Sequence, residues 1–288
     1  MRSDDWQIAE DIDDFLARAG GFLRSRPGLH TTMLSATERL RTRGPDGPDA
    51  QGAVFGLLEG TGGVGAAYYR LPSRGLGVTS LTPAQADTLA AHLVSRGQSL
   101  PWISADDGTA GAFAEAWQRH SGAAPTLRNR LFLYRLGTLT PPEPFPAGRG
   151  RLVGEPEHGQ LLRWCAEFAA DVREDVTIDA ASWAGTRFAE KRYTFWETPD
   201  GTPVSMAGAN PLVGGQVRVD PVYTPAALRG RGYAGAVTAE VSRAALAAGA
   251  EEVVLYTDPA NRTSNALYRR IGYELLTAWA VYDFAGTA

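Results

Sequence analysis

Lysine and cysteine are nearly missing from this sequence of 288 residues, because each occurs once, as Lys191 and Cys165. A single cysteine excludes an internal disulfide framework and a metal site built from clustered cysteines. The four histidines show none of the spacings that metal ligands need, so we expect no metal site. The arginine that replaces lysine elsewhere is typical of a GC-rich genome and says nothing about function.

Long apolar runs and excess positive charge are also absent. No stretch approaches the roughly 20 apolar residues of a membrane helix. The acidic start MRSDDWQIAEDIDDFL differs from a secretory signal peptide, which is basic and then apolar. The formal net charge is −4 and the isoelectric point about 5.6, which disfavours a nucleic-acid partner. With 44% hydrophobic residues, we expect a globular cytoplasmic protein without membrane contact.

A proline-rich stretch divides the chain into two nearly equal halves. Four prolines lie between Thr138 and Gly150, and they hold the segment extended because proline fixes φ and cannot donate a ladder hydrogen bond. We therefore expect one domain over residues 1–138, a linker over 139–150 and a second domain over 151–288.

Both halves repeat one order of elements, in which two helices precede strand-strand-strand-helix-strand-helix-strand. In the first half the patterns predict helices over 6–24, 31–43, 83–96 and 112–120, and strands over 53–58, 65–69, 77–81, 100–104 and 130–136. In the second half they predict helices over 155–172, 180–190, 233–248 and 264–271, and strands over 192–197, 204–209, 216–224, 252–257 and 278–284. Strand-helix-strand crossovers imply locally parallel pairing. The expected fold class is α/β (α+β), with a mixed twisted sheet flanked by helices in each half.

The residues most informative about function lie where a strand ends and a helix begins, in the segment VYTPAALRGRGYAG over 222–235. A helix start has four N–H groups without intrahelical partners and a partial positive charge. Gly230 and Gly232 let the backbone approach a ligand, and Arg229 and Arg231 can pair with phosphate oxygens. The loop is therefore predicted to bind a phosphate or pyrophosphate.

This loop has two other interpretations. On local grounds alone it fits an ordinary strand-to-helix turn whose arginines are solvated, since short glycine motifs match by accident. A dinucleotide fold is disfavoured because the G-x-G-x-x-G spacing is absent and the loop does not follow the first strand of its domain.

The surrounding sequence adds a family resemblance. The pattern R-x-x-G-x-A (Arg229, Gly232, Ala234) directly after a V-Y-T strand resembles the acetyl-CoA loop of the GNAT N-acetyltransferases. The segment LYTDPANRTSNALYRRIGYE over 255–274 is similar to the next strand, the helix and the aromatic glycine turn of that superfamily. The double length resembles a tandem GNAT protein, which implies two GNAT-like domains.

This resemblance implies acetyl-CoA as co-substrate and a set of residues that hold it. The backbone of Val222, Tyr223 and Thr224 would pair with the pantetheine arm like an added strand, beside a bulge or strand edge that Pro221 would suit. Asn265 would hydrogen-bond the same arm, although a helix-start role is an equal alternative. The residues implied to surround the pyrophosphate are Arg229, Gly230, Arg231, Gly232, Tyr233 and Ala234.

The implied reaction is attack of an amine on the acetyl carbonyl in a ternary complex. A backbone N–H near Tyr223 would stabilise the oxyanion. Tyr268, on the same helix face as Asn265, would protonate the CoA thiolate; without the motif, packing on the sheet would be the better interpretation of Tyr268.

The general base stays open. Some family members place a glutamate at the position of Arg218, and Asp220 is the nearest carboxylate on that strand. A water chain without any side-chain base is a further alternative. The other carboxylates considered are Glu174, Asp175, Asp179, Glu197 and Asp258, of which the first three would suit an acceptor amine.

The first half lacks the Arg-Gly-x-Gly turn at the equivalent place, and it has Trp117 and His120 where the second half has Asn265 and Tyr268. We therefore expect a degenerate copy that no longer binds the cofactor.

The resulting hypothesis is an N-acetyltransferase that acts on a primary amine of a small molecule, peptide or protein. A non-catalytic acyl-CoA-binding or regulatory module is one alternative, and a transferase of longer acyl or aminoacyl groups is another. The sequence leaves open the identity of the acceptor and whether the protein forms a homodimer.

Overall fold

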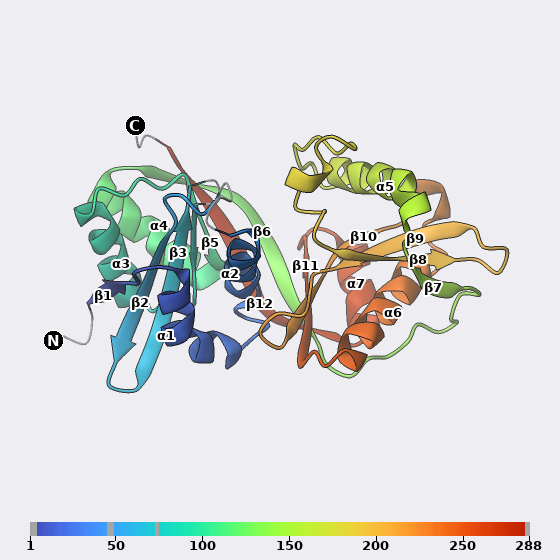
Figure 1. Ribbon diagram of the computed structural model, residues 1–288, viewed down its shortest axis with the longest axis horizontal. Helices are drawn as coiled ribbons and strands as arrows, with labels where there is room; N and C mark the ends of the chain where they lie inside the picture. The colour runs from blue at the N-terminus through green and yellow to red at the C-terminus, as the bar shows by residue number, and fades with distance from the viewer. Residues whose placement is uncertain (1–4, 45–48, 73–74, 286–288) are drawn as a thin grey trace. The chain divides into compact units, whose positions relative to one another are not determined.

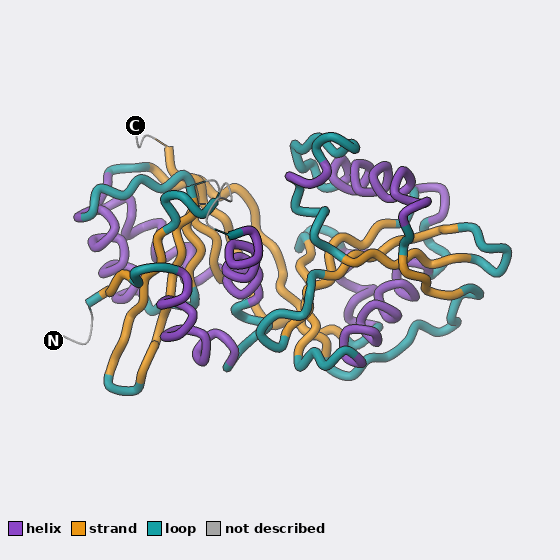
Figure 2. The backbone as a smooth tube through the Cα atoms, in the orientation of Figure 1, coloured by secondary structure: helices purple, strands orange, loops and turns teal. Residues whose placement is uncertain are grey.

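Two sequence repeats supply the elements of the computed structural model, which describes residues 5–44, 49–72 and 75–285 (Figures 1 and 2). The first repeat comprises β1 (Trp6–Ile8), α1 (Ile12–Arg24), α2 (Thr31–Arg43), β2 (Val54–Gly60), β3 (Gly63–Leu71), β4 (Gly75–Val78), α3 (Pro83–Ser95), β5 (Trp102–Asp106), α4 (Asp107–Ser121) and β6 (Ala124–Leu136). The second comprises β7 (Arg149–Leu152), α5 (His158–Asp171), β8 (Arg192–Glu197), β9 (Pro203–Ala209), β10 (Gln216–Tyr223), α6 (Tyr233–Ala247), β11 (Glu252–Thr257), α7 (Arg262–Arg270) and β12 (Tyr273–Ala285). Three short 3₁₀ turns, at Glu155–Glu157, Trp183–Gly185 and Ala226–Leu228, complete it. The predicted strand-strand-strand-helix-strand-helix-strand order is thus confirmed in both halves, whereas only the first half has two helices before it.

The chain divides into two compact units, and the division falls inside the strands β6 and β12. The first unit runs up to Leu133 and takes in the chain from Leu275 onward, whereas the second unit is Tyr134–Glu274. β12 lies beside β5, and β6 lies beside β11, so the final strands of the two repeats are exchanged. This differs from the expected division at 139–150. Strand patterns specify which face is buried but not which neighbour a strand takes.

The first unit has antiparallel pairing from β1 to β4 and parallel pairing between β4 and β5. Helices α1 and α2 pack against β2, β3 and β4, while α3 and α4 pack together beside β1 and β5. Its core contains Phe113 and Trp117 of α4 together with Ala280 and Phe284 of β12. Burial of each such large side chain contributes roughly 1.5–3 kcal/mol.

The second unit has the strand order β11-β10-β9-β8-β7. β10 and β11 are parallel, as the crossover through α6 predicts, and the remaining pairs are antiparallel. Helix α5 packs on β10 from one face, and α6 lies across the opposite face (Figure 1). The carboxyl ends of β10 and β11 therefore lie between α5 and the start of α6.

Three expectations about local structure were wrong. Residues 6–8 form a strand and not the start of a helix, and β7 begins inside the expected linker. Residues 180–190 form no α-helix apart from the 3₁₀ turn. The Asp179 side chain accepts hydrogen bonds from the N–H groups of Ala181 and Ser182, a local turn that competes with helix formation. No helix within the described ranges combines the length and the apolar character needed to cross a membrane.

Candidate active site

The strands β10 and β11 separate at their carboxyl ends. Their pairing stops at Arg218 and Val254, although the strands continue to Tyr223 and Thr257. Between Val219 and Val222, the register of β10 against β9 also shifts, which confirms the expected irregularity at Pro221. A cleft of about 680 Å³ lies at this separation of the two strands.

The loop between β10 and α6 lines this cleft with backbone. Gly230 and Gly232 have φ angles of +79° and +82°, a region that side chains with a Cβ adopt only at a cost. Gly232 is the N-cap of α6 and offers no side chain to the free N–H groups of the first turn. Free N–H groups and a helix dipole can hold an anion, so phosphate binding at this loop stays a prediction.

Most of the predicted cofactor residues gather around the one cleft. Arg231 and Asn265 are the two that do not line it. The residues that do are Val222, Tyr223, Thr224, Arg229, Gly230, Gly232, Tyr233, Ala234 and Tyr268.

Arg229 is held in place by the protein itself. Its Nε donates to the Thr224 carbonyl at 3.0 Å, and a terminal nitrogen bonds to the Asp171 carboxylate at the end of α5. The guanidinium also lies over the Tyr223 ring at 5.9 Å. An incoming phosphate would therefore compete with Asp171 for this cation.

Asn265 is buried, and its amide is used within the protein. Its nitrogen donates to the carbonyls of Asp258 and Asn261, and its oxygen accepts from the Thr257 hydroxyl at 2.6 Å. It therefore fixes the turn between β11 and α7. Asn261, which the sequence analysis did not single out, lines the cleft and caps α7 by accepting from the Ser264 N–H. Its position just before a helix was the signal that could have identified it.

Tyr268 lies on α7, which follows the diverging end of β11. Its side chain is buried, lines the cleft and packs edge-to-face on the Tyr273 ring at 6.0 Å. The Tyr268 hydroxyl hydrogen-bonds to no other residue in the described part of the chain, whereas the Tyr273 hydroxyl bonds to Ser242 at 2.7 Å. Burial raises the pKa of Tyr268 above its usual value, and the charge of Asp220 adds to this effect.

The Tyr223 side chain is turned toward α5. Its hydroxyl donates to Glu167 at 2.8 Å, and its ring contacts the Trp164 ring. Burial raises the pKa of Tyr223 to about 12, and the hydrogen bond to Glu167 acts in the same direction. The hydroxyl of Tyr223 is thus engaged within the protein, and the backbone role expected for Tyr223 stays a prediction.

Asp220 belongs to a cluster of charges at the carboxyl end of β10. Arg187 contacts the Asp220 carboxylate at 2.5 Å and the Glu174 carboxylate at 2.7 Å, and the Lys191 ammonium also bonds to Asp220. Burial alone would raise the pKa of Asp220, but the charges of Lys191 and Arg187 outweigh it and hold that pKa well below its usual value. An aspartate held in this way keeps no proton of its own at neutral pH, so any proton that it accepts must pass on to a neighbouring group.

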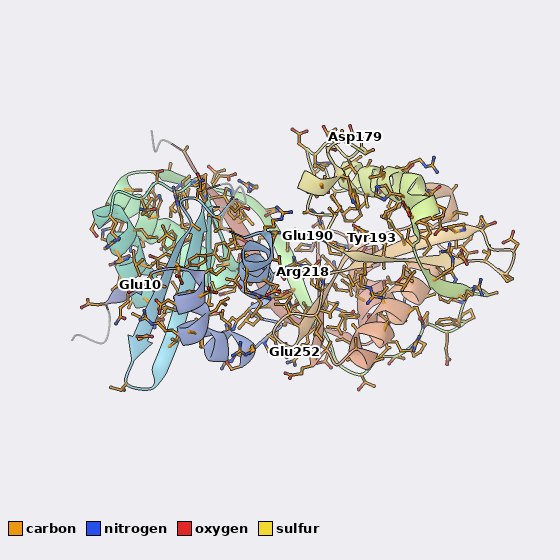
Figure 3. The ribbon with its side chains drawn as sticks, in the orientation of Figure 1. Glu10, Asp179, Glu190, Tyr193, Arg218 and Glu252 are labelled. Atoms are coloured by element: carbon orange, nitrogen blue, oxygen red, sulfur yellow. The ribbon has the colours of Figure 1, made fainter. Side chains whose placement is uncertain are left out.

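Two of the three carboxylates expected to attract an amine, Glu174 and Asp179, are likewise engaged. Glu174 pairs with Arg187, and Asp179 stabilises the turn after α5 (Figure 3). Glu197 pairs with Arg151 on the neighbouring strand β7. Of the candidates beyond Asp220, only Asp258 lines the cleft, so the structure brings two of the candidate carboxylates to it.

The equivalent helix start in the first unit has a different chemistry. Thr82 accepts from the N–H of Gln85 in a capping box, and Pro83 in the first turn has no N–H. The Tyr69 ring covers Gly77 so closely that a Cβ there would lie 2.3 Å from its Cζ atom. At the start of α3, a side-chain cap and a covering aromatic ring therefore take the place of the free N–H groups and the glycine turn at the start of α6.

Comparison with known proteins identifies the same half of the chain. Residues 159–273 match the sequence model of the acetyltransferase (GNAT) family, whereas no curated protein sequence matches the chain. A solved GCN5-related N-acetyltransferase from Sphaerobacter thermophilus is 19% identical over 96% of this chain and 94% of its own, with a TM-score of 0.58.

A second solved structure has the same two-part organisation. A tandem GNAT protein from the clavulanic acid biosynthesis pathway is 14% identical over 99% of this chain and 100% of its own, with a TM-score of 0.55. At this identity the likeness concerns the fold, and it extends over both halves of the chain. Residues 159–273 therefore match the acetyltransferase (GNAT) family, and the fold of solved GNAT proteins extends over both halves of the chain.

Proposed function

We propose that the second repeat, residues 151–288, transfers an acetyl group from acetyl-CoA to a primary amine of a small molecule, peptide or protein. The first repeat, residues 1–138, is a degenerate copy that binds no cofactor. The capped start of α3 and the Tyr69 ring over Gly77 support this second statement.

Acetyl-CoA binding follows from the cleft between β10 and β11. The pantetheine arm pairs with the backbone of Val222–Thr224 as an added strand. The pyrophosphate lies at the free N–H groups of α6, where Gly230 and Gly232 permit close approach. Arg229 supplies a charge-assisted hydrogen bond once it leaves Asp171. Asn261, which lines the cleft, replaces Asn265 as the polar contact from the α7 side.

The observation that carries the proposal is the Tyr268 hydroxyl, which hydrogen-bonds to no other described residue and lies in the same cleft as the uncapped start of α6. The amine nitrogen forms a bond to the acetyl carbon, a backbone N–H near Tyr223 stabilises the oxyanion, and the carbon–sulfur bond breaks. Tyr268 gives its proton to the departing thiolate. Its raised pKa keeps the proton in place at neutral pH, as a general acid requires.

The test is CoA release from acetyl-CoA against a panel of amines. Tyr268→Phe should lower kcat about 10²-fold, the usual scale of a general acid, with little change in acetyl-CoA affinity. Tyr273→Phe is the matched control, because it removes a buried hydroxyl from the adjacent ring. It should lower stability and leave kcat within about twofold.

A non-catalytic acyl-CoA-binding module is the competing function. It would show acetyl-CoA binding by calorimetry and no CoA release with any amine, in the wild type as in Tyr268→Phe. Turnover with a longer acyl-CoA in preference to acetyl-CoA would favour the transferase of longer groups.

A further inference from the structure

Lys191 is the only lysine of the chain, and it is buried beside the cleft. Its side chain is 4% exposed, although lysine is rarely buried without a functional or structural reason. Its ammonium bonds to Asp220, and Asp220 lines the cleft together with Tyr268. The Asp220 carboxylate therefore connects Lys191 to the cleft that Tyr268 lines.

Charged and titratable groups face Lys191 from three elements. Asp220 and Arg218 lie on β10, Arg187 lies in the segment that precedes β8, and the Cys165 thiol lies on α5. The Phe188 ring, 5.7 Å from the Lys191 nitrogen, lies next to them. Figure 3 shows Arg218 on β10 and Tyr193 on β8, the strand that Lys191 immediately precedes.

The balance of these charges allows Lys191 to lose its proton. The guanidiniums of Arg187 and Arg218 keep their charge at any working pH. Their two positive charges balance the two negative charges of the carboxylates Glu174 and Asp220, so the cluster does not need the charge of Lys191 for neutrality. Burial lowers the pKa of Lys191 to about 8, although Asp220 raises it. Lys191 thus exchanges a proton near neutral pH, and the cluster stays compensated without it.

We propose that Lys191 accepts, through Asp220, the proton that the acceptor ammonium must lose before it can attack the thioester. The inference rests on the proposed function and supplies its missing proton acceptor. Asp220 is the carboxylate that touches the substrate, and Lys191 is a positioning residue that stores the proton behind it.

The proton balance is complete with the groups present. The acceptor R–NH₃⁺ gives one proton to the Asp220 carboxylate, which passes it to the neutral Lys191 amine. The free amine forms the carbon–nitrogen bond, and the carbon–sulfur bond breaks. The thiolate takes the proton of Tyr268, and the nitrogen loses its second proton to restore Tyr268. Lys191 then releases the stored proton to solvent, so one proton is released per turnover.

The direct experiment is an NMR titration of protein labelled with ¹³C at the lysine ε-carbon. With one lysine in the chain, a single resonance reports Lys191 without assignment. We expect a midpoint near 8 in the wild type, and a lower midpoint in Asp220→Asn, because the carboxylate that favours the charged form is removed. A wild-type midpoint above about 10, the range of a solvated lysine, would overturn the inference. An Asp220→Asn midpoint equal to that of the wild type would do so as well.

The kinetic experiment compares pH profiles of the wild type and Lys191→Arg. Arginine keeps the positive charge and cannot release its proton, so kcat should fall about 10²-fold while acetyl-CoA affinity stays within about twofold. The rise in rate around pH 8 should disappear from the variant. The titration of the acceptor itself is common to both proteins and cancels in their ratio.

A merely structural Lys191 would give a ratio of the two rates that is constant with pH, and this result would overturn the inference. Absence of turnover with any amine would overturn both the proposed function and this inference. The wild-type NMR titration needs neither a variant nor an acceptor. It can therefore contradict this inference without contradicting the proposed function.

Discussion

Arg229 and Asp171 are bonded to each other at the cleft that both residues line. The guanidinium belongs to the loop before α6 and the carboxylate to the end of α5. The two side chains are 51% and 50% exposed, so the pair contributes at most about 1 kcal/mol to stability. In the proposed function its larger effect is on ligand binding, because Asp171 pairs with the guanidinium that would bind the pyrophosphate.

Removal of this competing carboxylate should strengthen cofactor binding. We expect Asp171→Asn to bind acetyl-CoA about two- to fivefold more tightly, since an exposed pair of this kind is worth up to about 1 kcal/mol. Calorimetry at low salt measures it. Glu240→Gln, which removes a similar exposed partner from Arg243 on α6, should leave the affinity unchanged. Weaker binding by Asp171→Asn would contradict the assigned role of Arg229.

The helix start of α6 can be tested with two glycines of equal strain. Gly232 and Gly249 flank α6 with φ angles of +82° and +93°, and a Cβ at either would meet no atom closer than 3.8 Å. Each alanine variant should lose roughly 1–2 kcal/mol of stability. Only Gly232→Ala should also weaken acetyl-CoA binding, by at least about tenfold, because the strained turn would redirect the N–H groups of the phosphate site. Equal affinities in the two variants would argue against that site.

The ion cluster of Asp220 should make stability depend on pH. The pKa of Asp220 is lowered in the folded protein, so its contribution is present above the unfolded-state pKa near 4 and is lost as pH falls below it. Asp220→Asn leaves Lys191 and Arg187 without their shared partner and should cost about 3 kcal/mol at pH 7. Denaturant unfolding at pH 7 and pH 3 should show this difference shrinking at the lower pH. A difference that grows on acidification would contradict the ion-pair account.

The exchanged strand β12 should stabilise the first unit. Phe284 is buried there against the rings of Phe113 and Trp117, so Phe284→Ala should cost about 3–5 kcal/mol. Hydrogen exchange should show the loss in α3 and α4 of the first unit. Leu275→Ala, at an exposed position of the same strand, should change stability by less than about 0.5 kcal/mol. Loss of protection confined to the second unit would contradict the exchange.

Local patterns predicted the elements and the phosphate loop because those signals are contained in short segments. Thr82 with Pro83, and Gly232 before α6, specify helix starts through their own backbone chemistry. The exchange of β6 and β12 has no local signal, since both strands fit either neighbour. The role of Asn265 stays a prediction: helix periodicity places the residue on a face, but the sequence does not reveal that its amide bonds to the 258–261 turn.

The charge cluster could be predicted only in part. The sequence offers Glu174 and Asp220 as candidate bases, but Arg187 lies inside the helix expected over 180–190 and Lys191 directly after it. The folding of this segment into a turn is what brings both cations to Asp220. The sequence alone therefore assigned free carboxylates to a region where they are paired.

The central claim is that the second unit binds acetyl-CoA between β10 and β11 with its thioester at Tyr268. A crystal structure of the protein with acetyl-CoA tests it most directly. The account predicts one molecule per chain, with its pyrophosphate at Gly230–Ala234 and its sulfur within hydrogen-bond reach of the Tyr268 hydroxyl. A molecule bound at the start of α3, or one whose sulfur lies away from Tyr268, would contradict it.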